Sequence, residues 1–266
     1  MNRLQALFAK RPKNLLSIYY TAGYPHLNST LSIAQLLEEA GVDFIEIGFP
    51  YSDPVADGPI IQSSSNQALE NGMRLKVLFH QLQDLRAQVQ IPVVLMGYLN
   101  VVLQYGIERF CERCQALGVD ACIIPDLPLE VYKRDYENLF KSYNISFICL
   151  ISPTTTEARI REIDQLESVF IYMVSSAATT GKDLNLGDQT AAYFNRIAQM
   201  NLKHPLIVGF GISNRESFQM ACHYASGAIV GSAFVKSLQG LEITEHGSLS
   251  REGQEQLNSF IKEIKG

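Results

Sequence analysis

Short apolar runs alternate along the chain with longer segments of helical spacing, and this alternation constrains the fold more than any other feature. We expect strands at Leu16–Tyr20, Phe44–Ile47, Val93–Met96, Ala121–Ile124, Ser146–Leu150, Phe170–Val174, Leu206–Val208 and Ala228–Val230. We expect helices between them at Leu31–Ala40, Leu75–Gln88, Ile107–Leu117, Glu130–Ser142, Glu157–Leu166, Thr190–Met200 and Glu216–Ala225. Continuously apolar strands are typical of a parallel sheet that helices cover.

Turn and cap residues support this order of elements. Gly41 and Gly118 each follow a predicted helix, where a C-terminal glycine is common. Ser213 and Asn214 precede another predicted helix and match an N-cap signal. The junctions therefore favour a repeated strand–helix unit.

Eight such units in about 240 residues fit a closed barrel, with an open doubly wound sheet as the alternative. No linker, charge block or low-complexity tract divides the chain. Leu4, Leu7 and Phe8 have helical spacing ahead of the first strand. We therefore predict an α/β fold, a single (β/α)₈ TIM barrel spanning residues 1–266 as one catalytic domain, with an extra N-terminal helix.

Composition and charge exclude several classes of function. Hydrophobic residues make up 47%, charged residues 18%, and the formal net charge is −5, so no basic patch suited to nucleic acid is evident. The longest nearly apolar stretch, 91–103, is interrupted by Pro92, Gly97 and Asn100, whereas a membrane span needs about 20 apolar residues. The N-terminus has no long apolar region of a secretory signal. We expect a cytoplasmic protein without membrane or nucleic-acid partners.

Cysteine and histidine spacing predicts no metal site. Cys111 and Cys114 form a C-x-x-C pair within a predicted helix, and no second pair follows at zinc spacing. The five histidines show no H-x-x-H or H-E-x-x-H spacing. We expect reduced thiols and no metal.

Glu46 interrupts the apolar run of the second predicted strand. Alternation places it on the face of Phe44 and Gly48, opposite Ile45 and Ile47, which is either the barrel interior or the helix-facing side. Burial would raise the pKa of this carboxyl toward neutrality, which suits a proton donor or acceptor. The alternative is a buried glutamate in a structural ion pair.

The loop 51–59 follows this strand and contains two acids, Asp53 and Asp57. Aspartate before proline or glycine is also ordinary turn chemistry. The loop lies at the barrel rim where active sites form, so Asp57 could face a substrate that Glu46 contacts.

Glycines follow the last predicted strands. Gly209 and Gly211 come after the seventh strand, Gly231 after the eighth, and Gly181 after the sixth. Glycine lets backbone amides approach a phosphate, and barrels often bind phosphate after strands 7 and 8. The pattern predicts a phosphate site, with tight turns alone as the alternative.

Aromatic and polar residues also follow other strands at the same rim. Tyr98 and Asn100 follow the third strand, Asp126 follows the fourth, and Tyr172 lies near the end of the sixth. Each alone could be a packing or turn residue. Together they suit a flat heteroaromatic ligand.

These segments resemble the motifs of tryptophan synthase α subunits, in the same order along the chain. The resemblance spans about residues 1 to 265. The matching motifs are 20–25 (YTAGYP), 46–59 (EIGFPYSDPVADGP), 126–128 (DLP), 209–213 (GFGIS) and 231–233 (GSA). The motif at 46–59 is the most specific of them.

The resemblance implies retro-aldol cleavage of indole-3-glycerol phosphate to indole and glyceraldehyde 3-phosphate. It implies Glu46 as the acid/base at indole C3 and at the glycerol hydroxyl, and Asp57 as the carboxylate near the indole N–H. The remaining implied substrate-binding residues are Gly181, Gly211, Gly231 and Ser232 at the phosphate, Tyr98 and Tyr172 at the indole ring, and Tyr19 and Phe210.

The resemblance also implies a partner. The family works as an α₂β₂ complex in which indole passes through a tunnel to a β subunit that carries pyridoxal phosphate. Asp53, Pro54 and Asp126 would lie toward that subunit. No cofactor would belong to this chain.

One segment departs from the family pattern. Where Ser-Arg-x-Gly-Val-Thr-Gly is usual, residues 175–181 place Ser176 and Ala178 at the basic and glycine positions of a mobile lid. An alternative function is therefore a catalytically impaired α-like subunit that activates its β partner. A further alternative is another phosphate-handling barrel, which the glycines fit but the 46–59 motif does not.

Overall fold

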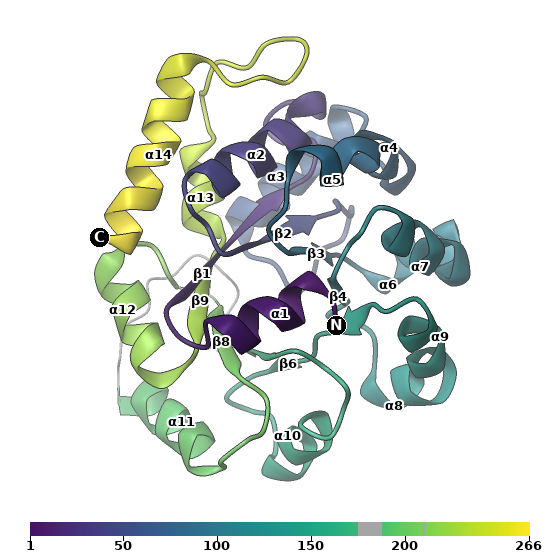
Figure 1. The fold of residues 1–266 in the computed structure, drawn as a ribbon, viewed down its shortest axis with the longest axis vertical. Helices are drawn as coiled ribbons and strands as arrows, with labels where there is room; N and C mark the ends of the chain where they lie inside the picture. Colours follow the sequence, from purple (N-terminus) through teal and green to yellow (C-terminus); the bar gives the residue numbers. More distant parts are fainter. Residues whose placement is uncertain (175–187, 210) are drawn as a thin grey trace.

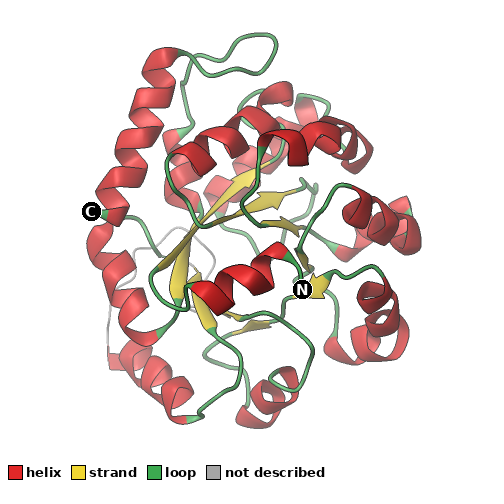
Figure 2. Ribbon diagram, in the orientation of Figure 1, coloured by secondary structure: helices red, strands yellow, loops and turns green. Residues whose placement is uncertain are grey.

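Nine parallel strands form one curled sheet surrounded by helices, in a computed structural model that describes residues 1–174, 188–209 and 211–266 (Figures 1 and 2). The sheet order is β5-β4-β3-β2-β1-β9-β8-β7-β6. The strands are β1 Leu15–Thr21, β2 Phe44–Gly48, β3 Val93–Met96, β4 Ala121–Ile123, β5 Ser146–Phe147, β6 Leu150–Ile151, β7 Ile171–Val174, β8 Leu206–Gly209 and β9 Gly227–Val230.

The segment 146–151 closes the barrel. Its first half, β5, pairs with β4, and its second half, β6, pairs with β7. The N–H of Ile148 donates to the carbonyl of Cys122 on one side (3.0 Å), and the N–H of Tyr172 donates to the carbonyl of Cys149 on the other (3.0 Å). The expected eight-unit barrel is thus confirmed. Its predicted fifth strand is split because the hydrogen-bond partner changes midway.

One helix precedes the first strand, and the others surround the outside of the barrel (Figure 2). They are α1 Arg3–Lys10, α2 Thr30–Glu39, α3 Pro59–Glu70, α4 Leu75–Gln81, α5 Leu85–Gln88, α6 Leu99–Tyr105, α7 Ile107–Ala116, α8 Leu129–Val131, α9 Glu137–Ser142, α10 Glu157–Ile163, α11 Asp188–Gln199, α12 Arg215–Tyr224, α13 Ser232–Ser237 and α14 Arg251–Lys265. Two predicted helices are interrupted, one by a 3₁₀ turn (Leu82–Asp84) and one by a π-helical turn (Tyr132–Tyr136).

Helix termini use the residues that the sequence indicated. Gly41 and Gly118 have φ of 79° and 70°, left-handed values that glycine adopts without steric cost. Asn214 caps α12 in a reciprocal capping box with Ser217. These caps fix where each helix ends and the next strand begins.

The barrel interior is a separate apolar cluster, and α1 covers one end of it (Figure 1). Phe44 belongs to this inner cluster, whereas Ile45 and Ile47 belong to the outer core between sheet and helices. Phe8 of α1 stacks on Phe170 at a ring-centroid distance of 5.5 Å and contacts Phe44 at 6.2 Å. The predicted N-terminal helix therefore closes the end of the barrel at which β2 and β7 begin.

The cysteines are free thiols, and four of the five are buried. Cys111 and Cys114 lie on the buried side of α7, as the helical reading of that segment predicted. Within the described residues no helix is long and apolar enough to cross a membrane, and no cluster of three candidate metal ligands occurs.

Candidate active site

Glu46 lies in the middle of β2 with its side chain in the barrel interior. It shares the inward face with Phe44, and its register partners are Tyr19 on β1 and Val94 on β3. The side chain is fully buried, and neither carboxyl oxygen has a hydrogen-bond partner among the residues that the structure describes. Burial raises the pKa of Glu46 to about 8. The structure therefore offers no described ion pair to explain this carboxyl as structural.

Asp57 lies in the loop between β2 and α3 and is 8% exposed. The hydroxyl of Tyr98 donates to its Oδ2 (3.0 Å) and accepts from the N–H of Ala56 (3.0 Å). Burial raises the pKa of Asp57 to about 6, while the hydrogen bond from Tyr98 opposes that rise. The loop thus holds a carboxyl whose ionised form is favoured at neutral pH.

Two tyrosines, Tyr19 and Tyr172, lie close enough to both carboxyl groups to feel their charge. Burial raises the pKa values of Tyr19 and Tyr172, and the negative charges of Glu46 and Asp57 raise both further. Because that effect falls off with distance, all four groups lie in one region.

Each of these tyrosines lies over a glycine of the neighbouring strand. A Cβ atom at Gly48 would come within 2.2 Å of the Tyr19 hydroxyl oxygen, and one at Gly209 within 2.1 Å of the Tyr172 hydroxyl oxygen. Any larger residue at either glycine would displace the ring. The absence of a side chain at these two glycines therefore leaves the space that the Tyr19 and Tyr172 rings occupy.

The backbone of Gly231 reaches the same mouth. Ile18 pairs with Val230, and a Cβ at Gly231 would lie 3.7 Å from the Cβ of Tyr19. Adjacent strands are about 4.8 Å apart, so Gly231 lies about 10 Å from Glu46, two strands away. Gly231 precedes α13, and no side chain among the described residues caps that helix. The backbone N–H groups at its start can therefore donate to an anionic group.

Of the other predicted phosphate-binding and ring-binding residues, the structure describes Gly211 and Ser232. Gly211 has φ of 76°, and Ser232 is the first residue of α13. Gly181, Phe210 and the segment 175–180 lie outside the described residues.

The candidate interface residues fall into two groups. Asp53 is exposed and accepts from Ser52 Oγ (2.6 Å). Asp126 is exposed and accepts from the N–H of Leu99 (2.8 Å), at the start of α6. Pro54 is buried, which differs from the expectation that it faces a partner. The apolar side chain that this loop exposes is instead Val55, which is 79% exposed. The sequence did not lead us to predict it, although a valine in a polar turn loop was a visible signal.

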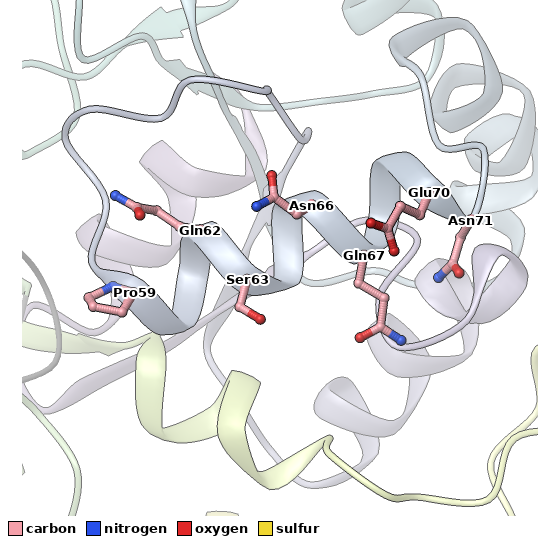
Figure 3. A pocket seen from close by; sticks show the side chains of 7 residues that line it. All are labelled: Pro59, Gln62, Ser63, Asn66, Gln67, Glu70 and Asn71. Atoms are coloured by element: carbon pink, nitrogen blue, oxygen red, sulfur yellow. The ribbon is translucent and has the colours of Figure 1, made fainter.

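A surface hollow of about 590 Å³ lies along α3, outside the group formed by Glu46 and Asp57 (Figure 3). It is lined by mostly polar side chains: Pro59, Gln62, Ser63, Asn66, Gln67, Glu70 and Asn71. The buried face of the same helix carries Ser64 instead.

The fold and the site define a class, a (β/α)₈-barrel protein with two buried carboxyl groups at one mouth. Comparison with known proteins gives the family. The sequence model of the family described as tryptophan synthase alpha chain matches residues 5–265. The chain belongs to this family.

Individual relatives agree with that assignment. The tryptophan synthase alpha chain of Flavobacterium psychrophilum is 50% identical over 264 residues, covering 99% of this chain and 100% of the relative. That of Bacteroides thetaiotaomicron is 52% identical over 239 residues, covering 90% and 93%. Among solved structures, the Campylobacter jejuni alpha subunit superposes with a TM-score of 0.82 at 30% identity, covering 97% of this chain and 98% of that one. The Legionella pneumophila alpha chain gives 0.84 at 29% identity, covering 100% and 96%.

Proposed function

We propose that the chain cleaves indole-3-glycerol phosphate to indole and glyceraldehyde 3-phosphate, with Glu46 as acid/base and Asp57 as electrostatic stabiliser. The observation that carries this proposal is the Glu46 carboxyl, buried at the barrel mouth with both oxygens unpartnered among the described residues and its pKa raised to about 8. Such a group holds a proton at neutral pH and can give it to a substrate carbon.

The reaction needs one proton delivered and one removed. Glu46 gives its proton to indole C3, and the ring nitrogen becomes positively charged. Asp57, ionised because its pKa is only about 6, stabilises that charge. The Glu46 carboxylate then takes the proton of the hydroxyl on the carbon attached to the ring. The bond from that carbon to C3 breaks, its electrons return to the ring, and an aldehyde leaves.

Different residues hold the two ends of the substrate in this proposal. Tyr98 and Tyr172 line the indole ring, to which Tyr19 and Phe210 add contacts. The phosphate is held by the backbone at Gly181, Gly211, Gly231 and Ser232. Support comes from the uncapped start of α13 about 10 Å from Glu46.

The family implies a β-subunit partner and an α chain that is generally free of cofactors. We propose an α₂β₂ heterotetramer in which the β subunit carries pyridoxal phosphate and receives the indole. The exposed loop residues Asp53, Val55 and Asp126 are the proposed contacts on this chain. We further propose a cytoplasmic location and a single catalytic domain over residues 1–266.

Indole release from indole-3-glycerol phosphate tests the proposal. The wild-type chain should release indole without a β subunit, and should do so faster when a β subunit is added. Glu46→Gln should release indole at least about 100-fold more slowly, because general acid–base catalysis contributes about that much. Equal rates for both proteins would refute the role of Glu46.

The alternative of a catalytically impaired activator rested on Ser176 and Ala178, which lie outside the described residues. Neither the described site nor the relatives support impairment. The alternative of a different phosphate-handling barrel is overturned by the family match over residues 5–265.

A further inference from the structure

Ser17 is a fully buried polar side chain in the middle of β1. Strand alternation turns it into the barrel interior, because Leu16 and Ile18 on either side of it pack in the outer core. Its Oγ has no hydrogen-bond partner among the residues that the structure describes. Burying a hydroxyl without a partner is costly, whereas an apolar residue at this position would carry no such cost. The serine therefore directs attention to the polar groups nearest to it inside the barrel.

Glu46 is the nearest such group on the neighbouring strand, and it is also fully buried and unpartnered among the described residues. Ser17 is the register partner of Phe44, and Glu46 follows Phe44 by two residues on the same inward face of β2. Adjacent strands lie about 4.8 Å apart and two residues rise about 6.6 Å, so the α-carbons of Ser17 and Glu46 are about 8 Å apart. The two side chains therefore share one part of the interior.

This separation and the chemistry of the two groups favour a water molecule between them. Buried polar groups in folded proteins are hydrogen-bonded to protein or to ordered water. Two successive hydrogen bonds through one oxygen atom cover about 5.6 Å, which the two side chains can extend to the full separation. A buried water needs two to four polar partners, and the Ser17 hydroxyl and one Glu46 oxygen supply two. The other flanks of Ser17 are apolar, since its register partners are Phe44 and Ile229.

We propose that the barrel interior binds one water molecule between Ser17 and Glu46, and that Ser17 is a positioning residue for the acid. The Ser17 hydroxyl donates to the water oxygen, and the water donates to the inward oxygen of the Glu46 carboxyl. The inward oxygen is thereby an acceptor, so the carboxyl proton is held on the other oxygen, toward the mouth. This role for the proton rests on the proposed function, whereas the water site does not.

High-resolution crystal structures of the ligand-free protein test the water site without turnover. The wild type should contain a water within about 3.2 Å of both the Ser17 Oγ and a Glu46 carboxyl oxygen, and Ser17→Ala should lose it. Ser146→Ala is the matched control, because it removes a buried strand hydroxyl that lies beside Asn2 instead, and it should keep the water. A wild-type interior without this water, or the same water at full occupancy in Ser17→Ala, would overturn the inference.

The kinetics of indole release test the positioning role. Ser17→Ala should lower kcat about 5-fold, the effect of one neutral hydrogen bond, and should leave KM within a factor of two. The basic limb of the pH profile should move to higher pH, because a carboxylate that loses a donor is less stable in its charged form. Ser146→Ala should change neither kcat nor the basic limb.

A fall in kcat with an unmoved basic limb would mean that Ser17 acts only on the fold, and would contradict the positioning role. An unchanged kcat together with a higher melting temperature would mean that the hydroxyl is merely unpaired. A failure of the proposed function gives a different result, since the wild-type chain would then release no indole while the crystal structures still decide the water site.

Discussion

The hydroxyl group of Tyr98 donates a 3.0 Å hydrogen bond to Oδ2 of Asp57. This bond favours the charged carboxylate and opposes the burial that raises the pKa of Asp57 to about 6. Glu46 has no such partner among the described residues, and its pKa rises to about 8. Two carboxyl groups at one mouth are thereby held in opposite protonation states near neutral pH, which is the arrangement that acid–base catalysis requires.

The pH dependence of kcat/KM should be bell-shaped. Activity should fall below about pH 6 as Asp57 gains a proton, and above about pH 8 as Glu46 loses one. Initial rates of indole release from pH 5 to pH 10 measure both limbs. Activity that stays level to pH 10 would show that protonated Glu46 is not the acid.

Tyr98→Phe should move the acidic limb to higher pH. The variant removes a hydrogen bond that lowers the pKa of Asp57, so a larger share of Asp57 is protonated at pH 7 and kcat/KM there should fall about 3-fold or more. Tyr51→Phe is the matched control, because the Tyr51 ring lies 5.2 Å from that of Tyr98 and the substitution keeps this contact. An acidic limb that shifts to lower pH would contradict the account.

Gly48→Ala should lower kcat/KM at least about 10-fold while the protein remains folded, because a displaced ring misplaces substrate. The added Cβ would lie 2.2 Å from the Tyr19 hydroxyl oxygen, so the tyrosine must move. Gly240→Ala is the control: its φ of 73° makes alanine cost about 1 kcal/mol, but no atom lies within 4 Å of the new Cβ. If Gly48→Ala and Gly240→Ala behave alike in activity, Tyr19 has no role at the site.

Glu46→Gln should stabilise the fold at alkaline pH. The pKa of Glu46 is raised in the folded state, so wild-type stability declines as pH rises from the unfolded value near 4.5 toward about 8, and then levels off. Glutamine stays uncharged at every pH, so the variant does not lose stability by burying an ionised carboxylate. The variant should match the wild type near pH 5 and melt about 2–4 °C or more above it at pH 9, corresponding to at least about 1 kcal/mol.

Thermal unfolding followed by circular dichroism at pH 5, 7 and 9 measures this difference. A wild type that is more stable than Glu46→Gln at pH 9 would mean that the folded protein favours the charged carboxylate, contrary to the burial described above.

Local pattern was sufficient to predict most of the barrel. The run Val93–Met96 is apolar throughout, and it forms β3 with those bounds. The split of the fifth strand was not predictable, because residues 146–151 form one apolar run and only the change of partner from β4 to β7 divides it. The helix α3 was missed, although Gly58 followed by Pro59 is a recognisable helix start.

The sequence predicted the site residues of each strand, but not the contacts between residues far apart in the chain. Alternation placed Glu46 on one of two faces of β2, and the packing of Phe44 inside the barrel decides between them. The contact of Thr21 with Ser64 joins residues 43 apart in the chain, and no local pattern indicates it. The same holds for the overlap of Tyr19 with Gly48, which depends on the register of two strands.

A crystal structure of Glu46→Gln with indole-3-glycerol phosphate tests the central claim most directly. The account predicts indole C3 in contact with the side chain at position 46, the ring nitrogen beside Asp57, and the phosphate on the amides that follow Gly231. A phosphate bound elsewhere, or a ring out of reach of position 46 and Asp57, would contradict it.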